Sequence, residues 1–258
     1  MGLDIYFYKV KPSKGVNANS VSELDADMEK QFTRKFNKAM NTFVKLLKTA
    51  TKEGDEVKRA DVINKLQEKT KELMEYDFYW KKITPDQTDK EILEIVKKNK
   101  LRAYQHADIY FRKVNFVYHF FADKLVEEAC IVEYDDVVEL INRCNKVIAA
   151  AEECGLIIKN GEIDKDYWAR IPEGKSWDDM SIDEHKAEEE RCQKKRVEIS
   201  TDWVEVAEEE LPTQAGFFFG GTDYDFDYLY DVVDCKKQFE KLLADWKKNE
   251  VVYNVMSW

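Results

Sequence analysis

Hydrophobic and polar positions alternate at both ends of the chain, which is the pattern of a β-strand with one buried face. In "LDIYFYKV" the apolar positions are Leu3, Ile5 and Phe7, and "VVYNVMSW" closes the chain with a similar composition. Successive side chains of a strand point to opposite faces of the sheet. These patterns predict a first strand at residues 3–10 and a final strand at residues 251–258.

Between these ends, apolar residues recur every three or four positions, the spacing of amphipathic helices. Ser20 and Glu23 match a capping box, so a long helix is expected from there to "KEGDE" near residue 54. Thr84 and Gln87 match another capping box at the start of a later helix. The further helices expected are at residues 57–75, 84–98, 101–129, 134–154, 203–211 and 226–246.

Turn residues and glycines suggest how the remaining segments are organised. Asn160-Gly161 favours a type I′ hairpin, and residues 164–198 are expected to form an exposed or mobile excursion. Phe217–Phe219, bracketed by glycines, are interpreted as a core strand first and as a pocket wall second. We therefore predict a mostly helical single α+β domain, residues 1–258, with a small sheet of the N-terminal, Phe217–Phe219 and C-terminal strands.

Charge is distributed unevenly along the 258 residues. The formal net charge of −11 argues against a general nucleic-acid binder. Residues 29–124, however, carry 22 basic and 15 acidic side chains, whereas residues 125–258 carry 16 and 33. Two interpretations stay open. Either the two parts have solvent-exposed helical faces of different charge, or the first part forms a basic surface for an anionic partner, which would include Lys35, Lys38, Lys45 and Lys48.

Other features of the composition narrow the class of protein. No apolar run approaches the ~18 residues that a membrane span needs, so we expect a cytoplasmic protein without membrane contact. The five cysteines never form C-x-x-C, which indicates reduced thiols and not a zinc site. Asp223, Asp225 and Asp227 resemble the start of a calcium loop, but Tyr228 stands where that loop requires glycine. These acids are interpreted as helix caps, and we predict no metal and no cofactor.

Three segments, "MGLDIYFY", "YFRKVNFVYHFF" and "LPTQAGFFFGGTDYDFDYLYDV", together resemble a family of phage and prophage proteins of unknown function. Members begin with M-G-L-D, carry Y-W-R-K-x-N-x-I-H centrally and end with L-P-T-x-x-G-F-F-F-G-x-T. This chain departs from them at Phe111, which replaces the tryptophan, and at Tyr118, which occupies the histidine position one place before His119. The resemblance implies an accessory protein that acts by binding, with a host or phage protein as its partner.

Polar residues in the central segment form the first set of candidate site residues. Their spacing of four, three, four and four residues would place them in one stripe of an α-helix: Asp108, Arg112, Asn115, His119 and Asp123. This stripe is either the solvated edge of a core helix or a functional groove. In a groove, Arg112 would hold a small anionic ligand and His119 would exchange protons. That arrangement suggests the alternative function, a small-molecule or nucleotide-handling enzyme.

The other candidate residues come from the recognised motifs. Asp4 either faces solvent or meets an arginine, with Arg112 as the candidate. Thr213 and Thr222 flank the glycine-rich segment and would bound a ligand pocket. The segment lacks G-K-[ST] and G-x-G-x-x-G, so a phosphate-binding loop is not predicted.

Overall fold

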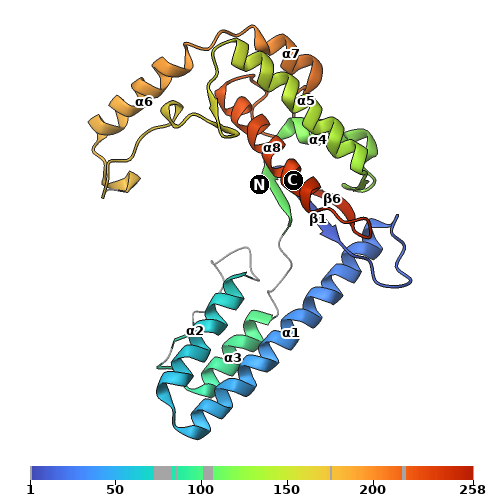
Figure 1. Ribbon diagram of the computed structural model, residues 1–258, viewed down its shortest axis with the longest axis vertical. Coiled ribbons are helices and arrows are strands. Elements are labelled where there is room, and N and C mark those ends of the chain that lie inside the picture. The colour runs from blue at the N-terminus through green and yellow to red at the C-terminus, as the bar shows by residue number, and fades with distance from the viewer. Residues whose placement is uncertain are drawn as a thin grey trace. The chain divides into compact units, whose positions relative to one another are not determined.

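The computed structural model describes residues 2–72, 83–84, 86–100, 107–174, 176–216 and 219–257. The chain separates into two compact units (Figure 1). Unit 1 comprises Met1–Phe7, Asp108–Lys248 and Val252–Trp258, and unit 2 comprises Tyr8–Ala107 and Asn249–Val251. Each unit has a hydrophobic cluster of its own, a division that the single-domain prediction did not include. The predicted α+β class is confirmed.

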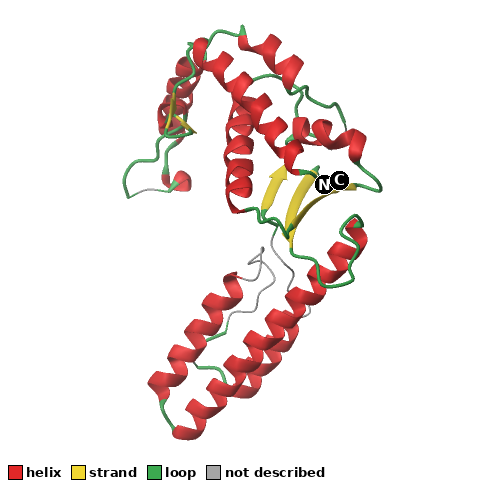
Figure 2. Cartoon of the chain, turned by 45° about the vertical axis from the view of Figure 1, so that its right-hand side comes forward, coloured by secondary structure: helices red, strands yellow, loops and turns green. Residues whose placement is uncertain are grey.

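A four-stranded sheet brings the two ends of the chain together in the order β2-β1-β6-β3 (Figure 2). Its strands are β1 (Asp4–Val10), β2 (Ile109–Arg112), β3 (Ala129–Val132) and β6 (Val251–Ser257). The pairs β1–β2 and β3–β6 are antiparallel, with Ile5 opposite Phe111 in the first. The prediction that the N-terminal and C-terminal strands share a small sheet is confirmed.

Helices and short elements complete unit 1. The helices are α4 (Asn115–Phe121), α5 (Tyr134–Glu153), α6 (Ile182–Arg196), α7 (Trp203–Glu210) and α8 (Phe226–Asp245). A hairpin joins β4 (Ile158–Lys159) to β5 (Glu162–Ile163), and its predicted turn has positive φ angles of 56° at Asn160 and 76° at Gly161. The described residues of unit 1 also form 3-10 helices at Ala122–Lys124, Lys165–Tyr167 and Trp177–Asp179.

The core of unit 1 is built on the apolar face of β1. Leu3, Ile5 and Phe7 are fully buried, as the alternation predicts. The ring of Phe7 lies 4.9 Å from that of Phe239 in α8, and it also contacts the rings of Phe111 and Phe121. Edge-to-face contacts of this kind add to the stability gained from burying the rings.

Within the described residues, the helix predicted at residues 101–129 is confirmed only at Asn115–Phe121 and is wrong before that. Residues 109–112 form β2, which pairs with β1, and the helix α4 begins only at Asn115. Lys113, between the two elements, has a φ of 62°, which no α-helix accommodates. Pairing with a strand about a hundred residues away therefore overrides the local helical spacing.

The glycine-rich segment also differs from its prediction. Phe219 lies in a bend and not in a strand, while Phe217 and Phe218 lie outside the described residues. The interpretation of Asp225 as a helix cap is confirmed, because its side chain accepts from the backbone N–H of Tyr228 at the start of α8, at 3.0 Å.

Residues 164–198, predicted as an exposed or mobile excursion, are largely exposed but include regular structure and buried side chains. They carry α6, which begins with a capping box of Ser181 and Glu184. Tyr167 is 1% exposed and belongs to the unit 1 core, so the start of the segment packs into the fold.

The described part of unit 2 is a helical bundle of α1 (Val21–Glu53), α2 (Glu56–Glu72) and α3 (Asp89–Lys100) (Figure 1). Ser20 caps α1, and Gly54 ends it with a φ of 70°, both as predicted. The start of α3 is later than predicted, since Glu91 forms its capping box with Thr88. The starts of α2 and α3 are linked by the buried Arg59, whose guanidinium bonds to the carboxylate of Asp89 at 3.2 Å.

Candidate functional site

Two of the three motif segments meet in unit 1, where the loop at residues 211–225 folds against β2 and α4. Hydrogen bonds close this loop: Tyr228 Oη donates to Leu211 O at 2.8 Å, and Thr213 Oγ1 donates to Thr222 O at 3.1 Å. Tyr224 Oη also accepts from the backbone N–H of Thr213 at 3.1 Å. The two predicted threonines therefore hold the loop in shape.

The loop is fastened to the junction of β2 and α4 by one buried amide. Asn115 is 4% exposed, and its Nδ2 donates to Gly221 O at 2.6 Å. At Gly220, which has a φ of 90°, an added β-carbon would lie 3.1 Å from Lys113 Cβ. Only glycine combines this backbone conformation with so close an approach.

A cleft of about 390 Å³ opens where the loop, the β2–α4 junction and the start of α8 come together. The part lined from the β2–α4 junction carries Arg112 and Lys113 and is called the basic wall, and the part lined from the loop and α8 is called the acidic wall. The acidic side chains are Asp223, Asp225, Asp227 and Asp231. We call this feature the charged cleft.

The carboxylates of the charged cleft are crowded. Burial first, and then the charges of Asp234, Asp227 and Asp225, together raise the pKa of Asp231 to about 7. Asp227 and Asp231 are four residues apart on α8, a spacing at which like charges destabilise a helix. Among the described residues, neither of these two carboxylates forms an ion pair, and the same is true of Arg112 and Lys113.

The predicted polar stripe is not assembled on one helix. Arg112 ends β2 and Asn115 begins α4, with the reversed backbone of Lys113 between them. His119 is exposed and its Nδ1 lies 3.0 Å from Gln214 Oε1 in the loop. Asp123 falls in the 3-10 helix that follows α4. The helical geometry on which the enzyme alternative depended is therefore absent from this segment.

The remaining candidates occupy other places. Asp4 lies directly opposite Arg112 in the β1–β2 ladder, but the two side chains form no ion pair in the described structure, and Asp4 Oδ1 instead accepts from Tyr110 Oη at 2.6 Å. Asp108 lies just before β2 and is exposed. Of the eight predicted site residues, only Arg112 and Asn115 line the charged cleft.

Sequence reasoning missed Lys113 and Asp231 and assigned the other acids to helix capping. Asp225 caps α8 and Asp227 lies in its first turn, where an acid is favourable, whereas Asp231 lies beyond that turn. The four-residue spacing of Asp227 and Asp231 was the available signal. It gained meaning only once the folded loop placed Arg112 and Lys113 in the same cleft.

Comparison of the chain with models of protein families, with curated proteins and with solved structures finds no match. No helix in the described part of the chain is long and apolar enough to cross a membrane. The described residues also contain no group of three or more histidine, cysteine, aspartate or glutamate side chains arranged to hold a metal ion.

Proposed function

We propose that the protein is a phage or prophage accessory protein that acts by binding another protein, from the host or the phage. The motif resemblance supports the phage connection. The proposed binding site is the charged cleft, which is built from two of the three motif segments. Its acidic wall would receive a lysine or arginine side chain of the partner.

The crowding of carboxylates around Asp231 carries this proposal. Burial and three neighbouring acids raise its pKa to about 7, so ionisation of this group is unfavourable while the cleft is empty. A cation within about 4–6 Å would favour the charged form and offset the repulsion. A basic side chain of the partner should therefore bind more favourably here than at an isolated surface carboxylate.

The basic wall of the cleft makes the site selective for one orientation of the bound partner segment. Arg112 and Lys113 would attract an acidic group of the same partner, so a segment with charges of both signs fits one way round. Since binding of a cation favours ionised Asp231, affinity should rise with pH between about 6 and 8.

Affinity capture from a host lysate, followed by measurement with the purified partner, tests the proposal. The variant Asp227→Asn with Asp231→Asn should bind at least about tenfold more weakly, because truncating one side of a desolvated charge pair typically costs 2–5 kcal/mol. Glu189→Gln with Glu190→Gln removes the same charge from exposed positions of α6 and is the matched control. Equal affinity of the two double variants would rule out the cleft, and a co-purifying small molecule without a protein would favour the enzyme alternative.

A further inference from the structure

The helix α1 has a face with positive charge only. From Lys30 to Lys52 it contains seven basic and no acidic residues. At about 100° per residue, six of the seven fall within about 80° of one another, over a length of about 33 Å. All six are exposed, and we call them the basic stripe: Lys30, Arg34, Lys38, Lys45, Lys48 and Lys52.

The opposite face of α1 is already occupied by the core of unit 2. Phe32, Phe36, Met40 and Leu47 are at most 5% exposed and belong to its hydrophobic cluster. An amphipathic helix that binds a lipid surface inserts its apolar face between the headgroups. Here that face is buried in the bundle, so the basic stripe is the surface that α1 offers to a partner.

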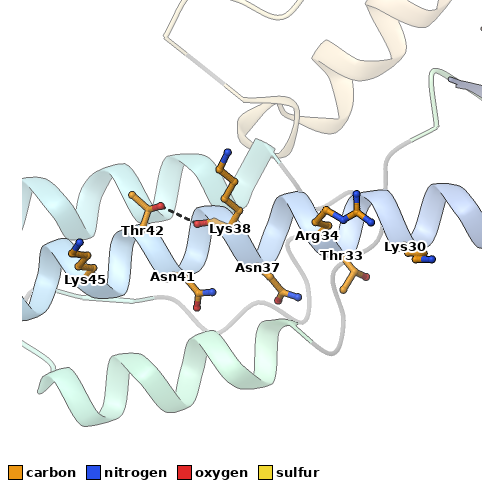
Figure 3. Close-up of a pocket in the computed structure, with 8 residues that line it drawn as sticks. All are labelled: Lys30, Thr33, Arg34, Asn37, Lys38, Asn41, Thr42 and Lys45. Carbon is orange, nitrogen blue, oxygen red and sulfur yellow. Dashed lines mark hydrogen bonds between the residues drawn. The ribbon is translucent and has the colours of Figure 1, made fainter. Parts of the chain in front are cut away.

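Polar side chains that can donate hydrogen bonds lie along the same surface. Figure 3 shows Lys30, Arg34, Lys38 and Lys45 along α1, with Asn37 and Asn41 between them. These residues line a shallow, open groove. The stripe itself contains no apolar residue.

The charges of the basic stripe are not balanced within unit 2. None of its six side chains forms an ion pair in the part of the chain that the structure describes, although Lys30 contributes to lowering the pKa of Asp27. On the neighbouring helix α2, by contrast, Lys58 pairs with Glu53 and Lys65 pairs with Asp61. Like charges three or four residues apart destabilise a helix, so an external polyanion would relieve repulsion along the whole stripe.

We infer that the basic stripe binds the sugar–phosphate backbone of a nucleic acid without reading its base sequence. Lysine, arginine and asparagine are among the side chains that contact phosphate oxygens in such complexes. The core of a protein–protein interface is instead depleted in lysine and enriched in aromatic residues, which the stripe lacks. The net charge of −11 does not oppose this binding, because charges beyond about 10 Å are largely screened at physiological salt.

Fluorescence anisotropy of the full chain with labelled oligonucleotides tests the inference. Two duplexes of unrelated sequence and about 20 base pairs, and a single strand of the same length, are titrated at several salt concentrations. We expect similar affinity for both duplexes. Neutralisation of four to six phosphates would give a slope of log K against log salt of about −4 to −5 for the duplexes.

Charge reversal locates the binding surface. Lys38→Glu with Lys45→Glu should flatten the slope by about 2 and weaken binding more than tenfold at low salt. Lys35→Glu with Lys90→Glu makes the same change in net charge at exposed residues off the stripe and should leave the slope almost unchanged. Circular dichroism checks that both variants keep their helices.

Three results would overturn the inference. The first is the absence of binding to any oligonucleotide at low salt. The second is an equal loss of affinity in the stripe variant and its control. The third is self-association of the chain in sedimentation, without oligonucleotide binding, that Lys38→Glu with Lys45→Glu abolishes. The stripe would then bind the net acidic segment at residues 125–258 of a second copy.

Discussion

Replacing Asp231 by asparagine should stabilise the protein, and the gain should grow with pH. Burial raises the pKa of Asp231 to about 7 in the folded state, from an ordinary value of 3.8. The folded state therefore binds a proton more tightly than the unfolded state does. Since stability falls with pH wherever the folded state holds more protons, ionisation of Asp231 weakens the wild type between about pH 4 and pH 7. Asparagine has no such ionisation.

The size of the effect follows from the same two values. At about 1.36 kcal/mol per pKa unit, a rise from 3.8 to about 7 corresponds to at most about 4 kcal/mol. Asp231 is only partly buried, so water screens part of this free energy. We expect the free energy of unfolding of Asp231→Asn to be higher than that of the wild type by about 1–3 kcal/mol at pH 8, and by less at pH 5.

Urea unfolding at several pH values between about 5 and 8 measures this difference. Glu189→Gln, on the exposed face of α6, removes the same charge outside the cleft and should show a stability difference that does not grow with pH. A pH-independent difference for Asp231→Asn, or a variant less stable than the wild type at pH 8, would refute the idea that crowded carboxylates destabilise the cleft.

Three further substitutions test contacts that stabilise each unit by itself. Phe7→Ala should lower the free energy of unfolding of unit 1 by about 3–5 kcal/mol in urea titration, because it empties the centre of an aromatic cluster. Arg59→Ala, which leaves the Asp89 carboxylate without its charged partner, should lower the free energy of unfolding of unit 2 by about 1.5–3 kcal/mol. Gly220→Ala should destabilise the loop by about 1–2 kcal/mol and increase its amide hydrogen exchange, since φ is 90° and Lys113 lies in the way.

Elements with strong local signals were predicted well from the sequence. The helix α1 combines regular apolar spacing with Ser20 at its start and Gly54 at its end, and each of these is decided by neighbours a few residues away. The hairpin at Asn160-Gly161 depends in the same way on two backbone conformations that these residue types favour. Local physical chemistry is sufficient for such elements.

The elements that were missed depend on contacts between distant residues. The strand β2 has only four residues, and it becomes a strand because Ile109 and Phe111 enter the core as β1 supplies their hydrogen-bond partners. The polar stripe predicted there assumed an unbroken helix, which the φ of 62° at Lys113 prevents. The charged cleft has the same origin, because Asn115 and Gly221 are 106 residues apart.

The basic stripe and the charged cleft differ in what their charges do to stability. The stripe spreads its charges over about 33 Å of exposed helix, where water weakens their repulsion. The cleft places the partly buried Asp231 about one helical turn from the exposed Asp227, and burial, followed by repulsion from neighbouring acids, raises the pKa of Asp231 to about 7. Stability and binding should therefore respond in opposite directions to Asp231→Asn: the variant unfolds less readily at pH 8 and yet holds a basic partner less tightly. A residue important only for folding would lose both together, so this opposition separates a binding role for Asp231 from a structural one.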